Sequence, residues 1–385
     1  METRFFPAIG RPISLLGFGL MRLPISPRHP NRIDQGLAET MIDQALAGGV
    51  NYFDTAYVYH DGQSEPFAGK ALSRHPRSSY NLATKMPTWQ LRSLDEAERI
   101  FEDQLAALRV DCIDFYLVHN LNSESHSIYR SLGLYESLSR KKEQGLIRRL
   151  GFSMHDGPPF LERILSEAEW DFAQIQLNYV DWDSLKSGEL YGLLHQRGLP
   201  VVIMEPLRGG QLAEPPQGVQ ALLSDRKPRA SAAAWGLRYA ASLPGVMTVL
   251  SGMSNPGQLA DNLQTFAKFK PLDDDEEDMM RRAANEFRLA NYIPCTGCRY
   301  CMDCPSGVEI PLNFAVYNLY RTLAAENALM ASMVFHNNYR SVSASARADQ
   351  CVSCGECATH CPQKIAIPSL MREITQLAQK AAKAS

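Results

Sequence analysis

Tyr52-Phe-Asp-Thr-Ala56 is a short apolar run, and an amphipathic stretch separates it from the next such run, Asn81-Leu-Ala-Thr-Lys-Met86. The same alternation continues outward from these two segments over residues 1–270. Short continuous apolar runs between amphipathic stretches are typical of buried parallel strands joined by helices. The expected strands are Leu15–Leu20, Tyr52–Ala56, Asn81–Met86, Phe115–His119, Arg149–Met154, Phe172–Tyr179, Val201–Met204 and Met247–Ser251.

Eight strand–helix units predict an α/β fold, a (β/α)8 TIM barrel, whose usual length is about 250 residues. An N-terminal hairpin is expected over residues 4–14, before the alternation begins. An open doubly wound sheet is the alternative, and it would carry Gly-x-Gly-x-x-Gly after its first strand. Gly17-Phe-Gly19 lacks the third glycine, which favours the barrel. Expected helices include Gly36–Ala47, Leu94–Leu108, Leu134–Gln144, Pro159–Ala168 and Arg229–Leu243.

The composition excludes several classes of protein. The chain has 385 residues, a hydrophobic fraction of 45% and a formal net charge of −3, enough for one large and one small domain. No apolar run reaches the about 18 residues of a membrane span, and no basic excess indicates a nucleic-acid partner. The first residues contain no secretory apolar segment, and the many thiols favour a reducing compartment, so we expect a cytoplasmic protein.

Beyond Pro271 the alternation stops, and residues 271–385 are expected to form a second domain. Eight of the nine cysteines lie there, in two motifs. The first motif reads Cys295-Thr-Gly-Cys298-Arg-Tyr-Cys301-Met-Asp-Cys304-Pro305, and the second reads Cys351-Val-Ser-Cys354-Gly-Glu-Cys357-Ala-Thr-His-Cys361-Pro362. The long segment between the motifs has helical apolar spacing over Leu312–Met333, so we expect a mainly α-helical ferredoxin-like domain.

The spacing of these cysteines is typical of iron–sulfur ligation. In two-cluster ferredoxins, three closely spaced cysteines hold one cluster and the fourth, before Pro, holds the other. One [4Fe–4S] cluster is therefore expected on Cys295, Cys298, Cys301 and Cys361, and another on Cys351, Cys354, Cys357 and Cys304. The first motif is one residue shorter before its last cysteine, which leaves the role of Cys304 open. Structural zinc usually takes paired cysteines, often with His, and disulfides need an oxidising compartment, so both fit less well.

Polar side chains occupy three neighbouring strand ends of the predicted barrel, where functional residues of this fold lie. Asp54 lies near the end of the second strand and Tyr59 follows that strand, while Lys85 lies near the end of the third and His119 ends the fourth. Reduction of a carbonyl by hydride leaves an alkoxide, which a Tyr hydroxyl can protonate. The Tyr pKa is ordinarily about 10, and a neighbouring Lys ammonium lowers it. We expect Asp54 to hold Lys85, and His119 to orient the carbonyl oxygen; Tyr57 is the competing tyrosine.

These residues and their order resemble the catalytic tetrad of the aldo-keto reductases, over roughly residues 8–268. The resemblance implies a barrel that binds NAD(P)H in extended form and reduces a small carbonyl substrate. It also implies contacts from Ser153, Gln176, Asn178 and Tyr179 to the nicotinamide. Pro206, Leu207 and Gly209 would supply backbone groups to the pyrophosphate, and Gly252, Ser254, Gln258 and Asn262 would form the adenosine loop.

The adenosine loop departs from that of many aldo-keto reductases, which place Lys or Arg where Gly252 and Gln258 stand. Its form resembles the loop of potassium-channel β subunits, which use NADP. We therefore expect NADPH, with NADH as the alternative, and the 2′-phosphate would rely on Ser254, Gln258 and backbone N–H groups at a helix start.

The whole chain resembles the aldo-keto reductases that carry a C-terminal 4Fe–4S dicluster domain. Three functions follow from this combination. The first is carbonyl reduction with structural or redox-sensing clusters. The second is electron transfer between a redox protein partner and a substrate in the barrel. The third is a nucleotide-binding sensor without turnover, against which the intact set of Asp, Tyr, Lys and His argues.

Overall fold

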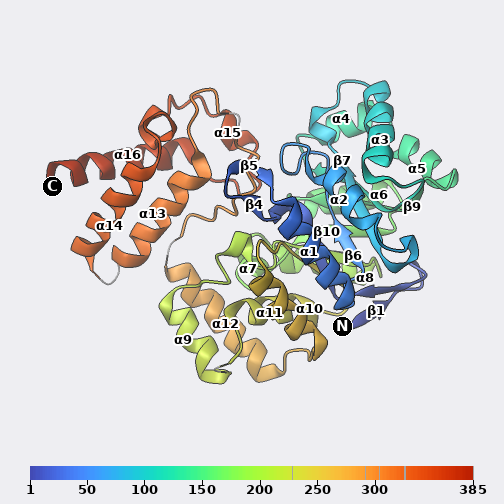
Figure 1. Ribbon diagram of the computed structural model, residues 1–385, viewed down its shortest axis with the longest axis horizontal. Coiled ribbons are helices and arrows are strands. Elements are labelled where there is room, and N and C mark those ends of the chain that lie inside the picture. The colour runs from blue at the N-terminus through green and yellow to red at the C-terminus, as the bar shows by residue number, and fades with distance from the viewer. Residues whose placement is uncertain (228, 291, 303, 325–326, 385) are drawn as a thin grey trace. The chain divides into compact units, whose positions relative to one another are not determined.

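The computed structural model describes residues 1–227, 229–290, 292–302, 304–324 and 327–384 (Figure 1). The chain forms two compact units, of which the first comprises residues 1–207 and 233–280. The second comprises residues 208–232 and 281–385. The domain boundary expected at residue 270 stays a prediction. The compact units differ from it in two places, because residues 208–232 group with the cysteine-rich part of the chain and residues 271–280 group with the first unit.

The first unit contains a closed barrel of eight parallel strands, which confirms the predicted fold class. Each strand pairs with the next along the chain, and the last strand closes on the first. The strands are β3 (Leu16–Gly19), β6 (Tyr52–Asp54), β7 (Asn81–Met86), β8 (Ile113–Leu121), β9 (Ile147–Met154), β10 (Phe172–Gln176), β11 (Val201–Met204) and β12 (Val246–Ser251).

The strand ends differ in detail from the expected ones. Strand β8 runs to Leu121, two residues beyond the predicted end, and β10 stops at Gln176 instead of Tyr179. The early stop has a local cause, because Asn178 Oδ1 accepts hydrogen bonds from the backbone N–H groups of Val180 and Asp181. Such an Asx turn competes with the strand ladder.

Helices alternate with these strands, and side-chain caps fix several of their starts. Asp34, Ser93 and Asn255 each accept a backbone N–H three residues further on, which satisfies a donor that the helix cannot pair internally. The helices are α1 (Gln35–Ala47), α2 (Ser64–Leu72), α3 (Leu94–Leu108), α5 (Leu134–Glu143), α6 (Pro158–Glu167), α8 (Ser187–Gln196), α10 (Ala232–Ser242) and α11 (Pro256–Ala267). Short helices α4 (His126–Ser131) and α7 (Asp181–Ser184) follow β8 and β10.

Two antiparallel hairpins lie outside the barrel sheet. Strands β1 (Thr3–Phe5) and β2 (Pro12–Ser14) form the predicted N-terminal hairpin, and β4 (Ile25–Ser26) pairs with β5 (His29–Ile33). Large apolar side chains pack inside the barrel, where the ring centroid of Phe115 lies 5.0 Å from that of Tyr52 and 5.2 Å from that of Phe172. The barrel therefore has a filled interior, which leaves the strand ends and loops for chemistry.

The second unit is mainly helical, as predicted. Its helices are α9 (Gln217–Arg226), α13 (Ile310–Ala324), α14 (Ala328–Ser341), α15 (Glu356–Thr359) and α16 (Ile367–Ala384). Phe314, Phe335 and Met371 are fully buried in its core, and six of the motif cysteines belong to that core or pack against it. Helix α12 (Asp274–Leu289) begins with the acidic run Asp274–Glu277 and contributes residues to both units. Among the described residues, no helix is long and apolar enough to cross a membrane.

Candidate functional site

Lys85 is the centre of a buried polar group at the ends of β6 and β7. Its side chain is fully buried, and its Nζ donates to Asp54 Oδ1 at 2.7 Å and to the backbone oxygen of Thr55 at 2.7 Å. A third hydrogen bond, of 3.3 Å, runs from Nζ to the Tyr59 hydroxyl. The ammonium thus has three oxygen partners, one of them anionic, which compensates the cost of burying its charge.

His119 completes the group from strand β8. Its ring centroid lies 6.1 Å from that of Tyr59 and 5.0 Å from that of Trp89, and both pairs have an edge-on arrangement. Strands β6, β7 and β8 are neighbours in the barrel, so their ends meet at one edge. The structure therefore brings together the four residues that the sequence singled out, and Tyr59 is the tyrosine whose hydroxyl meets Lys85.

Burial shifts the pKa values of three of these four residues. It raises the pKa of Asp54 and lowers that of Lys85, while the charge of each residue opposes the shift of the other. Burial, followed by the charges of Lys85 and His155, lowers the pKa of His119 well below its usual range. His119 is therefore a neutral imidazole near pH 7, able to donate one hydrogen bond.

A second buried carboxylate lies behind Lys85, and the sequence analysis missed it. Glu65, on α2, is 4% exposed and accepts hydrogen bonds through Oε1 from Thr84 Oγ1 and, at 2.7 Å, from Gln104 Nε2. Gln104 Nε2 also donates to the backbone oxygen of Lys85, and Gln104 Oε1 accepts from Tyr116. Burial raises the pKa of Glu65 to about 7 despite these bonds. The signal in the sequence that could have identified Glu65 is its position on the apolar side of a helix.

The four predicted nicotinamide contacts are buried and engaged with other residues of the first unit. Ser153 Oγ accepts from the backbone N–H of Asn120 at 3.0 Å. Gln176 and Asn178 both donate to Asp181 Oδ2, at 2.8 and 2.6 Å. The Tyr179 ring lies 6.2 Å from the Tyr239 ring. The Gln176 and Asn178 amides are thereby held in fixed orientations, and their contact with a cofactor stays a prediction.

The predicted adenosine loop leads into the start of α11. Ser254 donates its backbone N–H to Gln258 Oε1 at 2.7 Å, and Asn262 donates to Ser251 Oγ at 2.9 Å. The first turn of α11 contains no acidic residue, and Pro256 begins the helix. A helix start without carboxylates suits an anionic phosphate, because the unpaired N–H groups and the dipole favour negative charge.

Arg22 stands beside this loop and was also missed by the sequence analysis. Ser254 Oγ donates to the backbone oxygen of Arg22 at 2.8 Å. A Cβ placed on Gly252 would lie 3.0–3.1 Å from three carbons of the Arg22 side chain. The guanidinium also forms an ion pair of 3.6 Å with Glu205, and the two side chains are 29% and 15% exposed. Arg22 thus brings a positive charge to the predicted adenosine loop, which contains no Lys or Arg of its own.

The predicted pyrophosphate segment is divided between the two units. Pro206 is buried in the first unit, where Leu207 Cδ2 would lie 2.8 Å from a Cβ placed on Gly236. Gly209 belongs to the second unit, where its backbone has a φ of +67° and packs against Thr296. The contact of these residues with a nucleotide stays a prediction.

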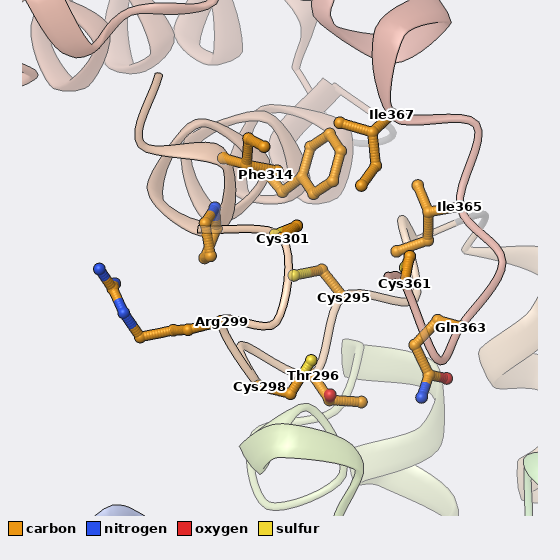
Figure 2. Close-up of a pocket in the computed structure, with 12 residues that line it drawn as sticks. Cys295, Thr296, Cys298, Arg299, Cys301, Phe314, Cys361, Gln363, Ile365 and Ile367 are labelled. Carbon is orange, nitrogen blue, oxygen red and sulfur yellow. The ribbon is translucent and has the colours of Figure 1, made fainter. Parts of the chain in front are cut away.

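The first set of cysteines surrounds a pocket in the second unit (Figure 2). Its wall includes Cys295, Cys298, Cys301 and Cys361, the set predicted for one cluster, together with the apolar side chains of Ile310, Phe314, Ile365 and Ile367. Burial and the neighbouring thiols of Cys298, Cys295 and Cys361 raise the pKa of Cys301 to about 12. These four thiols would ionise together only beside a compensating positive charge, as iron provides.

The other four cysteines form the second predicted set. Burial and the thiols of Cys351, Cys304 and Cys354 raise the pKa of Cys357 to about 11. Cys304 from the first motif therefore lies near the second motif, and Cys361 lies near the first, which is the exchange that the spacing predicted. Within the described part of the chain, no three His, Cys, Asp or Glu side chains close on a single metal ion. A cubane has a different iron for each thiolate, so its ligands surround a larger volume and this geometry fits it.

Comparisons with known proteins agree with this geometry. Residues 15–285 match the Aldo/keto reductase family, and residues 294–366 match the 4Fe-4S dicluster domain. The chain is 26% identical over 301 residues to L-galactose dehydrogenase of Arabidopsis thaliana, covering 72% of this chain and 92% of that protein. It is 28% identical over 219 residues to the NADH-specific methylglyoxal reductase of Escherichia coli, covering 52% of this chain and 65% of that protein.

Solved structures give the same result for the barrel. The aldo-keto reductase AKR11C1 from Bacillus halodurans, in its holo form, has a TM-score of 0.61 and 25% identity. The likeness covers 74% of this chain and 96% of that structure. The glycerol dehydrogenase AKR11B4 from Gluconobacter oxydans has a TM-score of 0.60 and 20% identity, over 74% of this chain and 96% of that structure, which supports the fold alone.

Proposed function

Because this chain belongs to the aldo-keto reductase family and is an NAD(P)H-dependent oxidoreductase, we propose that it reduces a small aldehyde or ketone with Tyr59 as the general acid. The observation that supports this most strongly is the buried Lys85 ammonium, which touches both Asp54 and the Tyr59 hydroxyl. A lysine buried and paired in this way is expensive to maintain, which argues for a role in proton transfer.

The proposed chemistry assigns one task to each of the four residues. Bound NAD(P)H supplies the hydride that reaches the carbonyl carbon. Tyr59 gives its hydroxyl proton to the oxygen that becomes an alkoxide, and Lys85 stabilises the phenolate that remains. Asp54 holds Lys85 in place through the 2.7 Å ion pair. His119, kept neutral by burial, donates a hydrogen bond that orients the carbonyl oxygen.

Arg22 supports a preference for NADPH over NADH. Its side chain lies against Gly252, beside the start of α11, where a 2′-phosphate is expected to bind. A guanidinium can pair with phosphate through two parallel N–H groups. NADH remains the second cofactor, because Glu205 already pairs with Arg22 and one relative is named as NADH-specific.

The second unit is proposed to hold two [4Fe–4S] clusters, each on three cysteines of one motif and one of the other. The sets Cys295, Cys298, Cys301, Cys361 and Cys351, Cys354, Cys357, Cys304 support this assignment through their mutual proximity. Bound clusters supply one-electron chemistry or structural stability.

Electron transfer is the second candidate function, and the exposure of Cys354 favours it. Cys354 is the exposed cysteine of the second set, so a cluster there would reach the surface, where a redox protein can approach. This function requires a converter between the two electrons of a hydride and the single electrons of a cluster. A bound flavin is one such group.

Anaerobic titration with NADPH, followed by visible and EPR spectra and then by addition of aldehydes, tests the proposal. We expect NADPH to bind, the clusters to stay oxidised, and NADPH to be consumed only when a carbonyl compound is present. Reduction of the clusters by NADPH alone would favour the electron-transfer function. Absence of binding of both NADPH and NADH would exclude carbonyl reduction by hydride transfer.

A further inference from the structure

The short segment Arg208–Gln211 is hydrogen-bonded to the backbone around Cys295, the first cysteine of the first motif. Both belong to the second unit. Gln211 Nε2 donates to the backbone oxygens of Ile293 at 3.0 Å and of Cys295 at 3.2 Å. One side-chain amide therefore holds two carbonyl groups on either side of Pro294, directly before the cysteine motif.

Gly209 allows the segment to approach the backbone of Thr296 closely. A Cβ placed on Gly209 would lie 2.3 Å from the backbone oxygen of Thr296 and 2.5 Å from its Cα, distances that no side chain tolerates. Its φ of +67° also lies in the left-handed region that favours glycine. The next residue, Gly210, has a positive φ as well, but a Cβ there would meet nothing within 4 Å. The lack of a side chain at Gly209 is thus required by the approach to Thr296.

Two further features hold the segment in place. The Arg208 guanidinium lies 5.6 Å from the centroid of the Phe287 ring, and Arg208 is 7% exposed. Thr296 is 3% exposed and lines the pocket of the first cysteine set (Figure 2). The backbone that touches Gly209 and Gln211 is therefore the backbone that cluster ligation by Cys295 and Cys298 would order.

The same segment continues directly from Pro206 and Leu207, which with Gly209 are predicted to bind the pyrophosphate. We propose that binding of the nucleotide and loading of the first cluster are thermodynamically coupled through the contact of Gly209 and Gln211 with Ile293–Thr296. The inference rests on the proposed function, because it takes the nucleotide site from it. A loaded cluster fixes Ile293–Thr296, which holds Arg208–Gln211 in one conformation and lowers the ordering cost of nucleotide binding.

Linkage makes this coupling reciprocal, so bound nucleotide must stabilise the cluster by the same factor. Couplings between sites are typically about 5- to 150-fold. Iron release then becomes a readout that needs no turnover. NADPH should slow the release of about half of the iron, that of the first cluster, while the iron of the second cluster is released at an unchanged rate.

The test measures anaerobic iron release to a chelator with and without saturating NADPH, together with the Kd of NADPH. The holoenzyme should bind NADPH at least about fivefold more tightly than the Cys298→Ser variant, which lacks the first cluster. It should also release about half of its iron more slowly when NADPH is present. Gln211→Leu removes the donor to both carbonyls and should abolish most of this protection. Gln220→Leu is the matched control, because Gln220 is exposed on α9 and its side-chain amide donates to Ser224 Oγ within the same helix. It should behave as the natural protein.

Gly209→Ala provides a second, steric disruption of the same contact. It should raise the Kd of NADPH and also uncouple iron release from NADPH. If NADPH binds the natural protein but leaves the release of all iron unchanged, the coupling is contradicted while the proposed function stands. If the Gln211→Leu variant keeps full protection, the assigned contact is wrong. If neither NADPH nor NADH binds the natural protein, the proposed function and the coupling both fail.

Discussion

At the scale of single residues, Lys85 explains why the site is assembled from distant positions. Its ammonium is buried and needs an anion, a carbonyl and a hydroxyl, which Asp54, Thr55 and Tyr59 supply. Burial alone lowers its pKa, and the Asp54 carboxylate acts against that change. A residue with this balance can hold a proton and exchange it with a neighbouring phenol.

The first prediction concerns Tyr59. Tyr59→Phe keeps the ring beside His119 and removes the hydroxyl, so carbonyl reduction should fall by about 10²- to 10⁴-fold. The Kd of NADPH should change little, because the ring is retained. Steady-state rates with a panel of aldehydes and a binding titration measure the two effects. Tyr57→Phe is the control. A loss of rate in the Tyr57→Phe variant alone would identify Tyr57, and not Tyr59, as the general acid.

The second prediction concerns Glu65. Burial raises its pKa to about 7, so the folded state binds more protons than the unfolded state between about pH 4.5 and 7. Stability contributed by this group therefore falls as the pH rises through the folded-state pKa, and the part lost between pH 6 and 8 is about 1 kcal/mol. Glu65→Gln should remove this part of the pH dependence. Denaturant unfolding of the natural and variant proteins at both pH values measures it, and parallel pH profiles would refute the assignment.

The third prediction concerns Arg22. Arg22→Leu should weaken NADPH binding by about 10- to 100-fold, the range for a lost charged hydrogen bond, and weaken NADH binding less. Arg28→Leu removes the same charge from an exposed position of the first unit and is the control. Titration of each variant with NADPH and with NADH measures the two Kd values. Equal losses for NADPH and NADH would remove Arg22 from the recognition of the 2′-phosphate.

At the scale of elements, the sequence predicted which residues lie at the strand ends. It did not predict the side-chain contacts that join one element to another. Asp54, Lys85 and His119 lie near the carboxyl ends of apolar runs, and the parallel arrangement of these strands puts the ends at one edge of the barrel, so hydrophobic periodicity was enough to group them. Glu65 and Arg22 could not be found in that way. Glu65 depends on Thr84 and Gln104, and Arg22 depends on Gly252, contacts between elements far apart in sequence.

Cysteine spacing was the most informative signal in the second unit. The motif rule predicted that Cys304 and Cys361 exchange partners, and the structure brings each beside the opposite motif. The sequence could not show that residues 208–232 group with this unit, because contacts such as those of Gly209 with Thr296 and of Gly218 with Glu286 join positions far apart in the chain.

The fourth prediction tests the cluster ligands. Cys298→Ser should reduce the iron content from about eight to about four atoms per chain, because one of two four-iron clusters is lost. Cys112→Ser is the control, since Cys112 lies in the barrel unit, bonds to the backbone oxygen of Ile113 and should leave the iron content unchanged. Iron and sulfide analysis of anaerobically purified protein gives the numbers. Full iron content in Cys298→Ser would contradict the ligand sets.

At the scale of the whole molecule, two units with different redox chemistry share one chain. The barrel has the residues for a two-electron step, and the second unit has the cysteines for one-electron steps. The segment Arg208–Gln211 of the second unit follows Pro206 and Leu207 of the first unit directly in the sequence, and Gln211 bonds to the backbone of Ile293. In the proposed function, hydride transfer is the reaction and the first cluster sets the affinity for the nucleotide.

The most direct test of this account follows the hydrogen itself. The holoenzyme would be given an aldehyde and NADPH deuterated at both C4 positions, and the alcohol product would be analysed by mass spectrometry. Direct hydride transfer in the barrel predicts one deuterium on the former carbonyl carbon, with the clusters oxidised throughout. A product that carries hydrogen from solvent at that carbon, formed while the clusters are reduced, would contradict the central claim.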